Sequence, residues 1–108
     1  MDNFSLFLKE KNMSITVTLQ MKVKEARYAE LQQFLQANLP NVRGFAGALS
    51  VGVFYNAEQQ DLMLFEEWLS QEHHQAYIQF ISENGVMSQL LSFMQDAPVI
   101  TYYGREVL

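Results

Sequence analysis

Four short stretches of the chain are rich in apolar residues, and in the first of them hydrophobic and polar residues alternate one by one. These stretches cover residues 14–23, 48–55, 61–69 and 99–106. In the first of them Ile15, Val17 and Leu19 share one face, while threonines and a glutamine occupy the other. Because successive side chains point to opposite faces of a strand, this alternation predicts a β-strand, and the other three apolar stretches are predicted to be strands as well. The polar segment at residues 56–60 predicts a hairpin between the second and third strands.

Two other segments carry apolar residues at intervals of three and four, which is the spacing of one helix face. The first helix is predicted over residues 25–38, and we expect Pro40 to end it. The second helix is predicted to begin after Ser70, a good N-cap residue, and to end at Gly85. Its predicted buried stripe consists of His73, Ala76, Tyr77, Phe80 and Ile81. A further short helix is predicted before the fourth strand.

The order of these elements, β-α-β-β-α-β, predicts a ferredoxin-like α+β fold, with a four-stranded antiparallel sheet and the helices on one of its faces. At 108 residues the chain has room for a single core. We expect this domain to span residues 13–108. Residues 1–12 are predicted to form an N-terminal extension, in which Phe4, Phe7 and Leu8 have the spacing of a short amphipathic helix. A loosely ordered segment is the alternative there.

The third and fourth strands are apolar on both faces. Leu64 and Phe65 alternate in the third strand, as do Tyr102 and Tyr103 in the fourth. The helices can cover only one face, and a bare apolar sheet face is typical of an interface. Each apolar side chain buried there contributes roughly 1.5–3 kcal/mol. We therefore expect a homodimer formed sheet against sheet, with Phe65 or Tyr102 in the interface.

The composition narrows the range of partners. The net charge is −5 and the basic residues are scattered, so we expect no binding to nucleic acid. Cysteine is absent, which excludes disulfides, thiolate metal sites and a cysteine nucleophile. No apolar run is long enough to span a membrane, and the first residues lack the basic and apolar regions of a signal peptide. We expect a cytoplasmic protein that does not contact a membrane.

His73 is the candidate catalytic base. Its spacing places it on the predicted buried stripe, near Trp68, and a half-buried imidazole can accept a proton near neutral pH. A histidine that merely packs in the core is the alternative. His74 lies about 100° around the helix and is expected to face solvent. Two adjacent histidines of one helix do not face one ion, so no metal site is predicted.

Glu66 and Trp68 share one face of the third strand. A carboxylate at an inward strand position is costly to bury unless it is paired. We expect a partner such as Arg105 or Tyr103, either in a structural ion pair or in acid–base chemistry. Trp68 either lines a pocket or belongs to the core.

One part of the sequence resembles a known protein family. It reads Glu-Glu-Trp-Leu-Ser over residues 66–70, followed by Tyr77, Phe80, Glu83 and Gly85. Together with the last strand, this pattern is similar to that of the antibiotic biosynthesis monooxygenase-like family of the dimeric α+β barrel superfamily. The resemblance extends over about residues 14–104. Ile81 departs from it, because relatives usually carry an arginine there, and His73 replaces a small residue.

The resemblance implies a dimeric α+β barrel and a cofactor-independent monooxygenase acting on an electron-rich aromatic, such as a quinol or a polyketide. In that function the substrate supplies the electrons, and the protein supplies a dry pocket and a base. His73 would be the base and Trp68 would stand beside it. The other pocket-lining residues would be Glu66, Tyr77, Phe80 and Tyr103. Neither a cofactor nor a metal is expected.

Two other functions stay open. The first is a non-catalytic dimeric module that binds a small apolar ligand or has a structural role. The second is haem degradation, which is disfavoured because the first strand contains no asparagine and position 78 is isoleucine. A shared fold does not decide between these functions, since function depends on the site.

Overall fold

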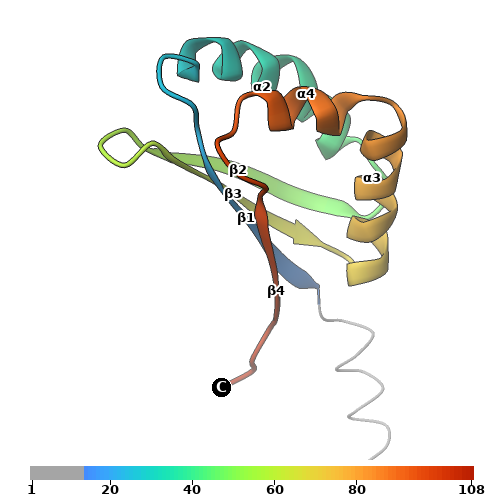
Figure 1. Ribbon diagram of the computed structural model, residues 1–108. Helices are drawn as coiled ribbons and strands as arrows, with labels where there is room; N and C mark the ends of the chain where they lie inside the picture. Colours follow the sequence, from blue (N-terminus) through green and yellow to red (C-terminus); the bar gives the residue numbers. More distant parts are fainter. Residues whose placement is uncertain (1–13) are drawn as a thin grey trace, which may run out of the picture.

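The computed structural model describes residues 14–108, so the predicted extension at residues 1–12 lies outside the described residues. Seven elements follow one another along the chain (Figure 1). They are β1 (Ile15–Lys22), α2 (Tyr28–Arg43), β2 (Ala48–Asn56), β3 (Asp61–Trp68), α3 (Gln71–Glu83), α4 (Val86–Ser92) and β4 (Val99–Gly104). Every strand and helix predicted for this part of the sequence is present, although several ends are shifted.

The four strands form one antiparallel sheet in the order β2-β3-β1-β4. The strands β2 and β3 form the predicted hairpin, and β1 lies between β3 and β4. The helices α2, α3 and α4 all lie on the same side of this sheet (Figure 1). The ferredoxin-like α+β fold predicted from the sequence is therefore confirmed.

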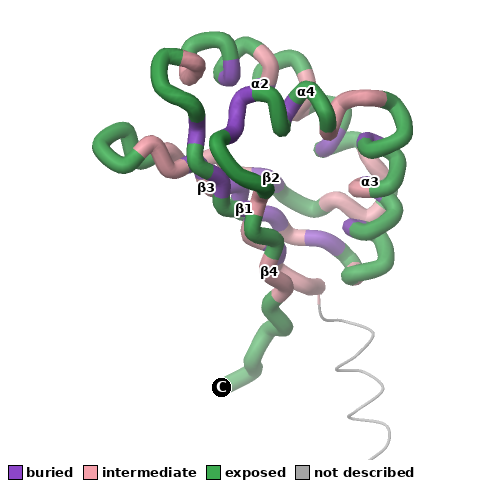
Figure 2. The backbone as a smooth tube through the Cα atoms, viewed as in Figure 1, coloured by how far each residue is buried: buried purple, intermediate pink, exposed green. Residues whose placement is uncertain are grey.

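The core lies between the helices and the inner face of the sheet (Figure 2). Val17 of β1 and Leu62 of β3 are fully buried there, and Leu31 of α2 packs in the same cluster. These side chains come from the alternating positions of the strands and from one stripe of the helix. Burial of each such side chain stabilises the fold by roughly 1.5–3 kcal/mol.

The helix α2 continues through Pro40 for one further turn, so the prediction that this proline ends the helix is wrong. Proline lacks a backbone donor and crowds the preceding turn, which can bend a helix without ending it. Around it, Asn38 Nδ2 donates to the Phe34 carbonyl at 2.8 Å, and the Gly44 amide donates to the Pro40 carbonyl at 3.0 Å. The additional turn places Asn41 beside the groove described below.

The buried face of α3 differs from the predicted stripe. His74, Tyr77 and Ile81 are buried, whereas His73, Ala76 and Phe80 are exposed. The reason lies in the N-cap, because Ser70 Oγ accepts the His73 amide at 3.1 Å and lies 2.6 Å from the His73 ring Nδ1. This cap holds the His73 ring at the surface of the first turn. His74, about 100° further around the helix, then faces the sheet.

No helix of the described residues covers the outer face of the sheet. The large apolar side chains exposed on it are Phe54, Phe65, Val99 and Tyr103. Phe65 therefore lies on the bare face, as predicted. Tyr102 does not, because it points inward to His74, and its predicted place in the interface is wrong. Within residues 14–108 no helix has the length and apolar character needed to cross a membrane.

Candidate functional site

A cluster of polar side chains is buried between the sheet and α3. Its members are Glu66, Trp68, His74 and Tyr102, from β3, α3 and β4. The indole Nε1–H of Trp68 donates to Glu66 Oε1 at 2.8 Å. His74 Nδ1 lies 2.8 Å from the Tyr102 hydroxyl, and His74 Nε2 lies 3.7 Å from Glu66 Oε1. The cluster therefore joins a carboxyl group, an imidazole and a phenol in one continuous row.

The strand register explains how residues far apart in the sequence meet. Val17 of the central strand β1 pairs with Glu66 on one side and with Tyr102 on the other. Paired residues of neighbouring strands lie on the same face, so both polar side chains point toward the helices. His74 in the first turn of α3 faces that row from above the sheet and packs edge-on against Trp68, with ring centres 5.3 Å apart.

Burial sets the charge states in this cluster. It lowers the pKa of His74 from 6.5 to about 4, so the imidazole is neutral at pH 7. Burial raises the pKa of Glu66, and the hydrogen bond from Trp68 offsets part of that rise. Burial, with a further contribution from the Glu66 carboxylate, raises the pKa of Tyr77 to about 12 and also raises the pKa of Tyr102. The imidazole therefore has a free lone pair at pH 7, but burial makes it a weaker proton acceptor than an exposed histidine.

His74 Nε2 is buried without a hydrogen-bond partner. Together with Glu66 and Tyr77 it lines a narrow internal cavity of about 40 Å³ between the sheet and the helices. Apart from Asn38, the other walls are apolar and include Leu64 of β3 and Met87 of α4. A cavity of this size holds a few water-sized molecules and is too small for an aromatic ring. His74, whose Nε2 is unpaired, therefore borders a space that a small molecule can enter.

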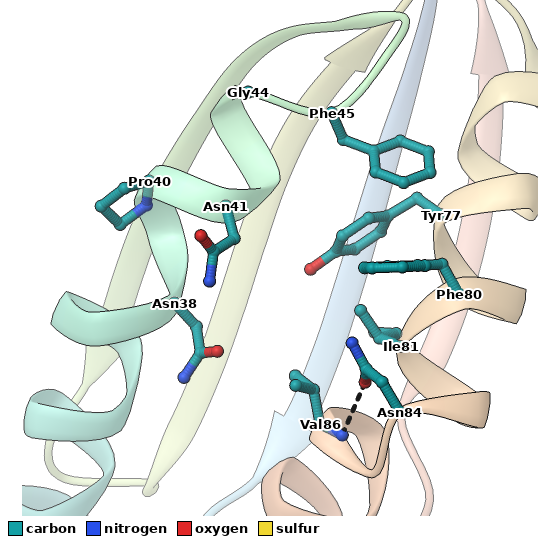
Figure 3. Close-up of a pocket in the computed structure, with 10 residues that line it drawn as sticks. All are labelled: Asn38, Pro40, Asn41, Gly44, Phe45, Tyr77, Phe80, Ile81, Asn84 and Val86. Carbon is teal, nitrogen blue, oxygen red and sulfur yellow. Dashed lines mark hydrogen bonds between the residues drawn. The ribbon is translucent and has the colours of Figure 1, made fainter.

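A wider groove adjoins this cavity (Figure 3). Its volume is about 500 Å³, and it lies between the end of α2 and the helices α3 and α4. The groove and the cavity share four lining residues, which are Asn38, Tyr77, Ile81 and Val86. The Tyr77 hydroxyl points across the groove toward α2, and the rings of Phe45 and Phe80 stand beside it (Figure 3). Such a volume is typical of small-molecule sites, which measure about 300–1,000 Å³.

The structure brings some of the predicted site residues together and separates others. Glu66 lines the cavity, Phe80 lines the groove and Tyr77 lines both. Trp68 is fully buried behind Glu66. Tyr103 pairs with Thr16 on the outer face of the sheet, so the prediction that it lines the same pocket is wrong.

The two histidines exchange their predicted positions. His73 is exposed and packs against the backbone of Gly47, whereas His74 occupies the buried site. The partner predicted for Glu66 was Arg105 or Tyr103, but its contacts are Trp68 and His74. His74 was missed because Tyr77 and Ile81 have the spacing of one helix face with either histidine. A buried stripe that contains these two residues can therefore begin at His73 or at His74. The signal that could have revealed it is the Ser70 cap, which fixes the side chain three residues later at the surface.

Other groove residues carried no signal in the sequence. Phe45 comes from the loop after α2, Asn38 and Asn41 from α2, and Asn84 from the turn before α4. They meet only in the folded chain. Among residues 14–108 no group of three or more histidine, aspartate and glutamate side chains is arranged to hold a metal ion.

The low pKa of His74 predicts how stability changes with pH. As pH falls from about 6.5 to about 4, the unfolded chain binds a proton at this position and the folded chain does not, so folding weakens by on the order of 2 kcal/mol. Glu66 acts in the opposite direction, because its raised pKa weakens folding as pH rises above 4.5. Urea denaturation between pH 7 and pH 4 should therefore show a smaller loss of stability in His74→Asn than in His73→Asn. Equal losses in the two variants would contradict the placement of His74.

No protein-family model matches the chain, and no curated protein matches its sequence. Solved structures do match its fold. A conserved protein from Methanosarcina mazei Go1 has a TM-score of 0.76 and 17% identity, over 90% of this chain and 96% of that one. A candidate antibiotic biosynthesis monooxygenase from Bordetella bronchiseptica has a TM-score of 0.77 and 16% identity, over 90% and 100% of the two chains.

A third similar structure carries a ligand. It is a monooxygenase from the gene ActVA-Orf6 of Streptomyces coelicolor in complex with nanaomycin D, with a TM-score of 0.72 and 12% identity, over 89% of this chain and 90% of that one. Identities this low establish the fold alone. The resemblance predicted from the sequence is confirmed at that level: the chain has the fold of the antibiotic biosynthesis monooxygenase-like proteins.

Proposed function

We propose that this protein is a cofactor-independent monooxygenase that acts on a small electron-rich aromatic, such as a quinol or a polyketide. The observation that supports this most strongly is the buried His74, which has an unpaired Nε2 and lines a cavity next to a groove of ligand size. The similar fold of a monooxygenase solved with nanaomycin D supports the same class of chemistry. A pocket filled only by apolar side chains would favour a non-catalytic module, but here Glu66, His74 and Tyr77 all border the cavity.

In this function the substrate ring lies in the groove, because the inner cavity is too small for it. Tyr77 and Ile81 border both spaces, so the reactive edge of the ring lies at their junction. The cavity beyond holds a water molecule and the dioxygen. His74 accepts a proton from the substrate through that water, which is within the usual reach of a general base.

The remaining polar contacts support this proton transfer. With Nδ1–H donating to Tyr102, His74 presents a lone pair at Nε2, and the Glu66 carboxyl group 3.7 Å away stabilises the positive charge that forms. The deprotonated substrate then transfers an electron pair to dioxygen and forms a carbon–oxygen bond. For an activated methylene group, the carbon loses two hydrogens, one oxygen atom becomes a carbonyl, and the other leaves as water. Electrons and atoms balance without a further reductant.

Oxygen consumption with a panel of quinols and anthrones tests this function. We expect uptake above the uncatalysed rate for at least one substrate, with one dioxygen consumed for each anthrone oxidised to its quinone. No uptake above background with any member of the panel would favour the non-catalytic ligand-binding module instead.

We propose further that two chains pair through the outer face of the sheet. Phe54, Phe65 and Tyr103 are about half exposed there, and apolar faces of this kind are typical of interfaces.

Light scattering should give twice the mass of the chain at micromolar concentration. Phe65→Lys should weaken the dimer by about 2 kcal/mol or more, because it places a charge in the centre of the interface. Leu91→Lys, on the exposed side of α4, is the matched control and should leave the mass unchanged. A monomeric wild-type protein would disprove the pairing.

A further inference from the structure

The groove presents two walls of different chemistry. On the α3 side, Phe80 and Phe45 form an aromatic wall, with ring centres 5.6 Å apart (Figure 3). On the α2 side stand the amides of Asn38 and Asn41, and Asn84 closes the end of the groove. Asn41 makes no side-chain hydrogen bond to another described residue, and Asn84 uses only its Oδ1, which accepts the Val86 amide at 3.0 Å. Amide donors and acceptors therefore face a surface suited to a flat ring.

No charged side chain lines the groove. The nearest basic residue on α2 is Arg43, whose Nη2 donates to the Val51 carbonyl at 3.1 Å and is held against β2. The acidic residues nearby are Glu83, next to Asn84, and Glu66 in the adjoining cavity. The whole chain carries a net charge of −5. An anion bound in this groove would lose its hydration shell and find no cation in return.

We infer that the groove selects an uncharged, flat aromatic that carries hydroxyl or carbonyl groups, and that it rejects the carboxylated form of the same molecule. This inference rests on the proposed function and names its substrate class. The ring stacks against Phe80 and Phe45, while the oxygen atoms on its edge bind the asparagine amides. Neutral amides hydrogen-bond either a hydroxyl or a carbonyl, but they do not neutralise a carboxylate.

The test compares two dye molecules that differ by one carboxylate. Chrysazin is an uncharged dihydroxyanthraquinone, and rhein is its carboxylated counterpart. Calorimetric titration at pH 7 should give a Kd for chrysazin that is at least about tenfold lower than that for rhein. Phe80→Ala should weaken chrysazin binding by about fivefold or more, because it removes an exposed stacking surface.

A charge placed in the groove should reverse this preference. Asn41→Arg supplies a cation on the groove wall and should tighten rhein binding by about tenfold. Gln33→Arg adds the same charge on the exposed side of the same helix, away from the groove, and is the matched control. It should change the Kd of rhein by less than about twofold. Both residues are exposed, so neither change disturbs the core, and thermal melting verifies this for each variant.

Three results would overturn the inference. They are rhein binding as tightly as chrysazin, neither molecule binding, and Asn41→Arg behaving like Gln33→Arg. Because anthraquinones have no methylene group to oxidise, the measurement does not depend on turnover. Selective binding of chrysazin without oxygen uptake from any quinol or anthrone would leave this inference standing and reject the monooxygenase.

Discussion

Alanine in place of Trp68 is expected to lower the free energy of unfolding by about 3–5 kcal/mol. Trp68 is fully buried, packs against His74 and Tyr77, and is the only donor in hydrogen-bond contact with Glu66 Oε1 among the described residues. The change leaves a cavity at the end of β3 and also removes the partner of a buried carboxyl group. Urea denaturation at pH 7 measures the loss.

Trp68→Phe separates these two contributions. Phenylalanine fills much of the space but cannot donate a hydrogen bond, so we expect a smaller loss of about 1–3 kcal/mol. Leu69→Ala is the control, since the neighbouring Leu69 is half exposed and its truncation should cost less than about 1 kcal/mol. A loss for Trp68→Ala no larger than that of the control would contradict the buried cluster.

The fold could be predicted because its strands and helices have regular spacing. The alternation of Val17 and Leu19 with threonines marks a strand with one buried face, and the structure buries both residues. The element order then leaves few arrangements in which two helical segments cover one sheet. Pro40 was misjudged because a proline removes one backbone donor and can bend a helix without ending it, and here the helix runs on to Arg43, with the Gly44 amide donating to the Pro40 carbonyl.

The candidate site could be predicted only in part. Glu66 and Tyr77 followed from strand and helix spacing, since each lies on a face whose direction the apolar residues determine. The choice between His73 and His74 did not follow, because Tyr77 and Ile81 fit a buried stripe with either histidine. The deciding contacts are the hydrogen bonds between Ser70 and His73 at the N-cap of α3. They hold the His73 side chain at the surface, although the apolar spacing allows it to be buried.

The groove lay beyond sequence reasoning for a different reason. Phe45 follows one helix and Asn84 precedes another. Asn41 lies in the last helical turn of α2, after Pro40, where the helix was predicted to have ended. Only tertiary packing brings them to one place. Asparagine has no preferred periodicity that marks it as a ligand-binding residue, so only the folded arrangement shows three amides beside two aromatic rings.

His74→Asn is expected to lower the rate of oxygen uptake by at least about 100-fold, the usual contribution of a general base. The asparagine amide can keep the contact with Tyr102 that His74 Nδ1 makes, but it has no group at the position of Nε2. The variant therefore removes the proton acceptor while it preserves the support behind it. Thermal melting establishes that the variant is folded before its rate is compared.

The central claim, that the buried His74 and not the exposed His73 performs the proton transfer, is tested most directly by measuring this rate in two matched variants. His74→Asn and His73→Asn change adjacent residues in the same way, one buried and one exposed in the first turn of α3. With an anthrone that the wild-type protein oxidises, we predict a loss of at least about 100-fold for His74→Asn and less than about threefold for His73→Asn. Equal rates in His74→Asn and the wild type, or a larger loss in His73→Asn, would contradict the account.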